Sequence, residues 1–197
     1  MSIRSFIALP IPIEMANALG DAAAQMTYQD KSNAVRWVNQ ENYHLTLAFL
    51  GDLSELELEV LADQLDINVR QTGFDLCLSH FSPFPESRPK LLAAIIANNE
   101  HLSALHKQVH SALSACQITL DRKKFLPHIT LGRFRHSKNS FAGAIPRTLD
   151  LSAHIDEVTI FESRLTTHGA EYEPLFRFPL DEDDTSIAGH EYESSWS

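Results

Sequence analysis

Hydrophobic and polar residues alternate in some stretches of this chain and recur at helical spacing in others. In the N-terminal half, an apolar run at residues 5–9 predicts a short strand, and residues 14–25, after two prolines, have helical composition. Further strands are expected at residues 35–38 and from His44 onward. The first half therefore predicts the order strand, helix, strand, strand.

The second half shows the same order. Residues 91–97 predict a strand, and residues 100–115 predict a helix whose apolar side chains recur at helical spacing. A strand near residues 118–120 is expected before another that begins at His128. The histidine follows the start of the first strand by about 40 residues in one half and about 37 in the other, which suggests an internal duplication into two lobes.

The remaining segments complete a single predicted domain over residues 1–180. The pattern predicts a helix at 55–65 and strands at 74–78, 155–163 and 172–180. Residues 82–89 contain three prolines and are expected to form a loop or linker. Residues 181–197 are acidic and rich in serine, and are expected to form a surface tail.

One four-residue phrase occurs in both halves, as His44-Leu45-Thr46-Leu47 and as His128-Ile129-Thr130-Leu131. In a strand, successive side chains point to opposite faces, so each histidine shares a face with its threonine. On the same grounds Phe49 is expected on the apolar face with Leu45 and Leu47. Packing alone would preserve the apolar face and leave the polar face free to vary, so the repetition indicates chemistry.

Two histidines that share a site are suited to general acid and base catalysis, because imidazole exchanges protons near neutral pH. Two imidazoles on opposite sides of a phosphorus atom could drive an in-line displacement without a metal. The hydroxyls of Thr46 and Thr130 could donate hydrogen bonds to the phosphate oxygens, where negative charge develops. The alternative for each motif taken singly is an ordinary strand histidine beside a good strand former.

The charge distribution restricts the kind of partner. The net charge is −10, which argues against a protein that binds along the phosphate backbone of a long nucleic acid. Six acidic residues and no lysine or arginine lie from Asp181 onward, so the body is nearly balanced. A nucleic acid would then be held locally, at a terminus.

Other sequence features carry little functional information. Cys77 and Cys116 lie in apolar surroundings and are expected to be buried, reduced thiols. His106 and His110 are four residues apart on a predicted helix, but they lack the glutamate of a zinc protease motif, and we expect a solvated helix face. There is no apolar run long enough to span a bilayer and no signal-peptide core at the N-terminus, so we expect a cytoplasmic protein without membrane contact.

At both histidine motifs the chain resembles the two-histidine phosphoesterases, and within them the RNA 2′,3′-cyclic phosphodiesterases, also called 2′-5′ RNA ligases. The likeness covers residues 3–180 and is carried by segments 6–9, 36–38, 42–51, 127–133 and 161–166. It implies an α+β, bilobal fold with two pseudo-symmetric lobes. Each lobe would have an antiparallel sheet and helices, with the active cleft between them.

The resemblance also implies a reaction, the hydrolysis of a terminal RNA 2′,3′-cyclic phosphate to a 2′-phosphate, without a metal or organic cofactor. It makes His44 the proton donor to the leaving 3′ oxygen and His128 the proton acceptor from water, although nothing in the two similar halves distinguishes these roles. The expected partners are RNA termini or small cyclic-phosphate nucleotides, bound by a monomer. Family members also catalyse the reverse 2′-5′ joining of RNA ends.

Several side chains keep two interpretations. Arg133 matches a phosphate-holding arginine of the family, but ideal alternation puts it on the face opposite His128, so it needs a strand end or a bulge to turn inward; otherwise it is a surface residue. Trp37, Tyr43 and Phe49 could stack on a base or belong to the core. Arg164 fits either the family pattern or a structural ion pair. For the whole chain, the alternative to an enzyme is a non-catalytic module that binds RNA ends.

Overall fold

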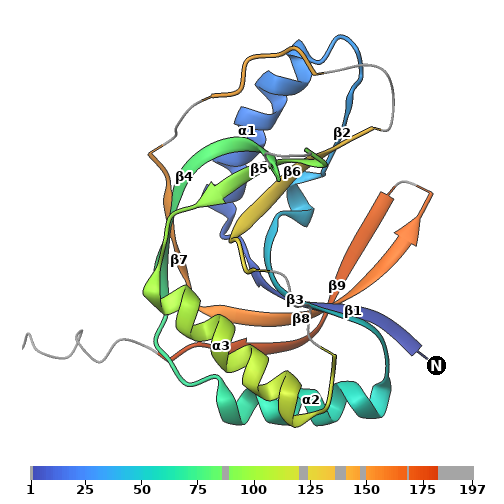
Figure 1. Cartoon of the computed structure of the whole chain (residues 1–197), viewed down its shortest axis with the longest axis vertical. Helices are drawn as coiled ribbons and strands as arrows, with labels where there is room; N and C mark the ends of the chain where they lie inside the picture. Colours follow the sequence, from blue (N-terminus) through green and yellow to red (C-terminus); the bar gives the residue numbers. More distant parts are fainter. Residues whose placement is uncertain are drawn as a thin grey trace, which may run out of the picture.

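A computed structural model of the chain describes residues 2–85, 89–119, 124–135, 141–146, 150–167 and 169–181. It contains three α-helices, one short 3-10 helix and nine strands within these ranges (Figure 1). Their order is β1 (Ser2–Pro10), α1 (Ile13–Gln29), β2 (Val35–Trp37), η1 (Gln40–Asn42), β3 (His44–Ser54), α2 (Glu55–Asn68), β4 (Phe74–Phe84), β5 (Leu91–Ile96), α3 (Glu100–Ala115), β6 (His128–Phe134), β7 (Ser152–Ile155), β8 (Glu157–Thr166) and β9 (Gly169–Pro179).

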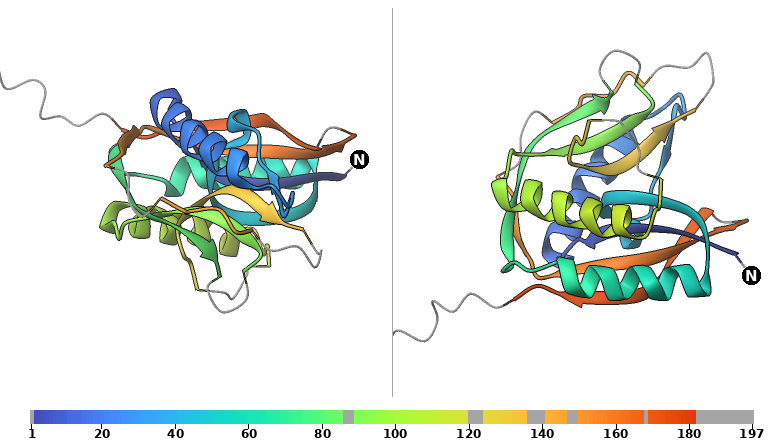
Figure 2. Two further views of the ribbon diagram at one scale, coloured as in Figure 1. Left: turned by 90° about the horizontal axis from the view of Figure 1, so that it is seen from above. Right: turned by 60° about the horizontal axis from the view of Figure 1, so that its bottom comes forward.

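The strands form one antiparallel sheet whose order mirrors the duplication expected from the sequence. The order is β7-β4-β5-β6-β3-β1-β8-β9, with β2 paired to β6. The two histidine strands, β3 and β6, lie at the centre, and β1 and β5, which open the two halves of the chain, flank them. The two expected sheets are therefore the two halves of one continuous, curled sheet (Figure 2).

Helices α1 and α3 each pack on the half of the sheet opposite to the one that holds the strand before them. Helix α1 follows β1 but packs on β2 and β7 in the other half of the sheet, and α3 follows β5 but packs on β3. Helix α2 lies beside α3 and contacts β3 and β9 (Figures 1 and 2). Each half of the sheet is thus covered by a helix from the opposite half of the chain, which ties the halves into one body.

Local chemistry explains where these elements begin. Strand β3 runs directly into α2 through a capping box, in which the Ser54 hydroxyl accepts from the Glu57 N–H at 3.3 Å and the Glu57 carboxylate accepts from the Ser54 N–H at 2.8 Å. Helix α3 is capped at its N-terminus by Asn99, whose side-chain oxygen accepts from the Leu102 N–H at 2.9 Å. None of the described helices is long and apolar enough to cross a membrane.

The predicted helices and most predicted strands are confirmed, with two corrections. Residues 118 and 119 form no strand, and Leu120 lies outside the described residues. The expected 82–89 loop begins too early, because β4 continues to Phe84 and pairs Pro83 with Leu92 of β5. Strand β7 pairs with residues 74–77 of β4, and no other described strand pairs with this edge of β4 at Pro83, where a missing N–H is tolerated.

The two cysteines are free, as expected, but Cys77 is exposed rather than buried, and Cys116 is half-buried. Burial alternates along β4, and Cys77 falls on its outward face between the buried Leu76 and Leu78. The proposed boundary before the acidic tail stays a prediction, because residues 182–197 lie outside the described part of the chain.

The expectation of a solvated His106 and His110 face is wrong. Both rings are half-buried, with their centroids 4.0 Å apart. The His106 ring also stacks on Phe125, with a centroid distance of 3.9 Å, just ahead of the segment that leads into β6. Burial, and in second place the neighbouring His110, lowers the pKa of His106 to about 4.

This arrangement predicts a loss of stability in acid. Because the pKa of His106 is lowered in the fold from an unfolded value near 6.5, the unfolded chain binds a proton first as pH falls. The free energy of unfolding should therefore fall between pH 6.5 and pH 4. His106 should contribute about 2 kcal/mol, less than the full pKa shift implies, because water screens its partly exposed ring. Denaturant titrations at a series of pH values measure this dependence.

His106→Phe and His106→Ala separate the proton from the stacking. Phenylalanine keeps an aromatic ring on Phe125 and cannot titrate, so the variant should lose less stability in acid than the unaltered protein. Alanine removes the ring and should destabilise the protein at every pH. An acid dependence in His106→Phe equal to that of the unaltered protein would contradict the assignment.

Candidate active site

The two histidine motifs meet at the centre of the sheet. Strands β3 and β6 pair through Leu45 and Ile129, which are both fully buried. Extending this antiparallel register by one residue in each direction sets His44 opposite Thr130 and Thr46 opposite His128. These four side chains share one face, called here the histidine face, and the two histidines lie on a diagonal of about 7–8 Å between their strand positions.

Both imidazoles contact a backbone carbonyl oxygen through Nδ1. The Nδ1 atom of His44 lies 2.7 Å from the carbonyl oxygen of Asn42, and Nδ1 of His128 lies 2.7 Å from that of Leu126. A carbonyl oxygen can only accept a hydrogen bond, so Nδ1 carries the proton in each neutral ring. Nε2 is then the unprotonated nitrogen and is the atom able to accept a proton in both residues.

Aromatic rings surround the two histidines unequally. The His44 ring lies 4.9 Å from Phe6 and 5.0 Å from Tyr172, while the His128 ring stacks on Phe84 at 4.5 Å, measured between ring centroids. No local sequence pattern marks Phe6, Tyr172 or Phe84 as site residues. They come from β1, β9 and β4, and only the strand order brings them beside the motifs.

This surrounding changes the proton affinity of both imidazoles. Burial lowers the pKa of His44 to about 4, with the positive Arg133 and then His128 adding to the effect, although the hydrogen bond to Asn42 opposes it. Burial and then Arg133 also lower the pKa of His128, against the hydrogen bond to Leu126. In the free protein both rings are therefore neutral near pH 7.

The two threonines are available to a ligand. Thr46 and Thr130 are half-buried on the histidine face. Within the part of the chain that the structure describes, neither hydroxyl makes a hydrogen bond. Because a hydroxyl readily donates to an anionic oxygen, the pair provides two unengaged donors beside the imidazoles.

An irregularity in β6 places Arg133 on the histidine face. Leu92 of β5 pairs with Gly132 and its neighbour Ala93 pairs with Thr130, so Leu131 is an extra residue in β6. Such a bulge reverses the alternation beyond it. Arg133 is exposed, and its charge acts on both histidines. The bulge that an inward Arg133 requires is therefore present.

Strand β3 has a matching irregularity, and it corrects the expected position of Phe49. Ile7 pairs with Ala48 and Ala8 pairs with Thr46, so Leu47 is the extra residue. Phe49 accordingly leaves the apolar face: it is 69% exposed, and its ring lies 6.4 Å from Phe6. Phe49 follows His44 by five residues, as Arg133 follows His128.

The other candidate residues have structural surroundings. Tyr43 is buried in the core, and Trp37 is half-buried and packed against it. Arg164 forms ion pairs with Glu162 at 2.8 Å and with Glu173 at 2.6 Å, which joins β8 to β9. Among the described residues no group of three or more His, Cys, Asp or Glu side chains is placed to hold a metal ion.

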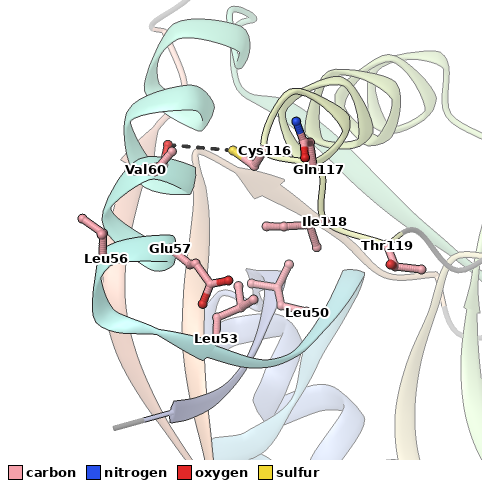
Figure 3. Close-up of a pocket in the computed structure, with 9 residues that line it drawn as sticks. All are labelled: Leu50, Leu53, Leu56, Glu57, Val60, Cys116, Gln117, Ile118 and Thr119. Carbon is pink, nitrogen blue, oxygen red and sulfur yellow. Dashed lines mark hydrogen bonds between the residues drawn. The ribbon is translucent and has the colours of Figure 1, made fainter.

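Two hollows in the surface lie away from the histidines. One of about 430 Å³ lies between α2 and the end of α3, where the Cys116 thiol faces the Val60 carbonyl at 4.0 Å (Figure 3). The other, of about 500 Å³, lies between α1 and residues 37–43. Neither is lined by His44, Thr46, His128, Thr130 or Arg133.

Known proteins match nearly the whole chain. The family model of the 2′-5′ RNA ligase superfamily matches residues 13–167. The RNA 2′,3′-cyclic phosphodiesterase of Thermotoga maritima is 27% identical over 88% of this chain and 94% of its own length, and the one of Escherichia coli is 29% identical over 90% and 96%. A relative of the same name from Geobacillus stearothermophilus is 27% identical over 89% of this chain, which spans 56% of that protein.

Solved structures agree with these matches. E. coli LigT complexed with 3′-AMP superposes with a TM-score of 0.79 at 26% identity, covering 92% of this chain and all of LigT. The TT0787 protein of Thermus thermophilus gives a TM-score of 0.78 at 25% identity with the same coverage. The α+β two-histidine fold expected from the sequence is confirmed, and the chain belongs to the 2′-5′ RNA ligase superfamily.

Proposed function

We propose that this protein hydrolyses the 2′,3′-cyclic phosphate at RNA ends to a 2′-phosphate, without a metal, through acid and base catalysis by His44 and His128. Its assignment as an RNA 2′,3′-cyclic phosphodiesterase is supported by curated relatives of that name across most of the chain. The observation that carries the proposed mechanism is the diagonal pairing of the two motifs at the centre of the sheet.

In the proposed reaction His128 accepts a proton from water through Nε2 as the water oxygen attacks phosphorus. The bond between phosphorus and the 3′ oxygen breaks opposite the attacking oxygen, and His44 donates a proton to the departing 3′ oxygen. The phosphate stays on the 2′ oxygen. His44 ends neutral and His128 protonated, so proton exchange with solvent restores the starting state. When a 5′ hydroxyl takes the place of the water, the same displacement on the cyclic phosphate joins the two RNA ends through a 2′-5′ linkage and leaves a free 3′ hydroxyl.

The roles of donor and acceptor depend on the charge of the substrate. Burial disfavours the protonated form of His44 in the free protein, yet a proton donor must carry that proton. A cyclic phosphate brings a negative charge to the histidine face, and an opposite charge close by raises the pKa of an imidazole. Substrate binding thus protonates the donor, and Arg133 and the two threonine hydroxyls stabilise the charge that develops on phosphorus.

Phe49 offers a position for the terminal base. Its ring is exposed, and it neighbours Phe6, which contacts His44. An exposed aromatic ring beside a phosphate site stacks on a nucleobase of any sequence. This arrangement suits an RNA end or a small cyclic-phosphate nucleotide as the substrate.

The mechanism predicts loss of turnover when either histidine is removed. His44→Ala and His128→Ala should each lower kcat by about 10²–10⁴-fold, because each removes one proton transfer. The measurement is product analysis with an oligonucleotide ending in a 2′,3′-cyclic phosphate, in the presence of EDTA. His154→Ala, which removes an exposed histidine paired with Asp75 on the sheet edge, is the matched control and should keep full activity.

Three results would contradict the proposal. An unaltered protein that loses activity in EDTA needs a metal. Equal activity in the three variants excludes the two-histidine mechanism. Tight binding of the oligonucleotide with no product favours the non-catalytic RNA-end module.

The lowered proton affinities predict an acidic pH profile. Because kcat/KM reports the pKa values of the free protein, and those of His44 and His128 are both below 6.5, the optimum of kcat/KM should lie below pH 6.5. Tyr172→Ala exposes His44 to water, which should raise its pKa and move the optimum upward. Tyr28→Ala, which removes a ring that is 78% exposed on α1, should not. An unmoved optimum in Tyr172→Ala would exclude burial as the cause.

A further inference from the structure

Arg133 has a second arginine directly beside it. Strand β2 pairs with β6 so that Arg36 is the cross-strand partner of Arg133. Directly opposed residues of an antiparallel pair project from the same face, about 5 Å apart at Cβ. Since Arg133 acts on both histidines, Arg36 is placed on the histidine face as well.

The packing of β2 supports this orientation of Arg36. Its neighbours Val35 and Trp37 point the other way, where both approach Gly132 so closely that an added Cβ would collide with Val35. Arg36 itself is exposed. Only glycine at position 132 allows β2 to lie this close to β6, and this contact sets the position of Arg36.

Within the described part of the chain, the arginine pair has no acidic partner. Asp30 is the carboxylate that precedes Arg36 most closely in the chain, and it already accepts the N–H groups of Ala34 and Val35 at 2.9 Å each and bonds to Trp37. Among the described residues neither Arg36 nor Arg133 forms an ion pair. Like charges directly opposed on a sheet destabilise it unless an anion lies between or beside them.

Two further basic residues lie close to Arg36 and Arg133. Arg135 is exposed just beyond β6, and its N–H donates to the Ala34 carbonyl. Lys90 is also exposed, and its carbonyl oxygen accepts a hydrogen bond from the Phe134 N–H. A basic end of β2 and β6 is unusual in a chain with a net charge of −10. Its position at one end of the histidine strand makes it an extension of the same site.

We propose that Arg36 binds the phosphate that precedes the terminal cyclic phosphate in an RNA strand. This inference rests on the proposed function and extends it to the substrate: the site prefers an oligonucleotide end over a cyclic mononucleotide. Arg133 begins about 15 Å from His128 along β6, and its long side chain reaches back toward the terminal phosphate. Arg36 lies on the neighbouring strand β2. Its planar guanidinium binds the next phosphate through two parallel hydrogen bonds to the phosphate oxygens.

The first experiment compares two substrates, adenosine 2′,3′-cyclic phosphate and a trinucleotide ending in a 2′,3′-cyclic phosphate. Arg36→Gln should lower the ratio of kcat/KM for trinucleotide over mononucleotide by about tenfold. Arg36→Lys keeps the positive charge but lacks the planar guanidinium, so its kcat/KM ratio should lie between those of the unaltered protein and Arg36→Gln. Arg70→Gln, which removes an exposed arginine beyond α2, is the matched control and should keep the ratio. An unchanged ratio in Arg36→Gln, or an equal loss on both substrates, overturns the proposal.

The second experiment needs no turnover. Fluorescence anisotropy with a labelled trinucleotide ending in a 2′-phosphate, over a series of KCl concentrations, should show a salt dependence that is shallower by about 0.7 in Arg36→Gln. If the unaltered protein opens neither cyclic phosphate but this change in slope appears, the proposed reaction fails and the phosphate contact stands. An unchanged slope overturns the contact whether or not the protein is active.

Discussion

The pairing of β3 with β6 is the contact on which the site depends. Leu45 and Ile129 are fully buried where the two strands meet, and every functional feature follows from their register. A slip of either strand by one residue would turn its histidine to the opposite face of the sheet. The crossed helices reinforce this contact, because α1 packs on β2 and β7 while α3 packs on β3.

An extra residue directly after the threonine of each histidine strand then sets the rest of the site. Leu47 and Leu131 occupy equivalent places, and each reverses the alternation so that the residue two positions further on faces the histidines. In one strand that residue is aromatic, Phe49, and in the other it is cationic, Arg133. In the proposed mechanism, the same backbone irregularity supplies a base-stacking residue from one strand and a phosphate-binding residue from the other.

The symmetry of the strands does not extend to the environments of the two imidazoles. His44 lies between Phe6 and Tyr172, whereas His128 has Phe84 against one ring face. Greater burial explains why the pKa of His44 falls to about 4. An enzyme of this kind needs one protonated and one neutral imidazole, and unequal packing gives the two imidazoles different pKa values. The negative charge of the bound substrate then raises the pKa that burial has lowered.

The sequence by itself determined the elements, the two His-x-Thr motifs and their shared polar face, because strand alternation and helical spacing are local properties. It indicated that an inward Arg133 would need a strand end or a bulge, with a surface arginine as the alternative, and it misplaced Phe49, Cys77 and the His106 face. Only the tertiary structure decided that His44 lies opposite Thr130, that Tyr172 and Phe84 reach the imidazoles, and that Arg36 stands beside Arg133. Those facts depend on strand order and register between distant segments, which no local pattern encodes.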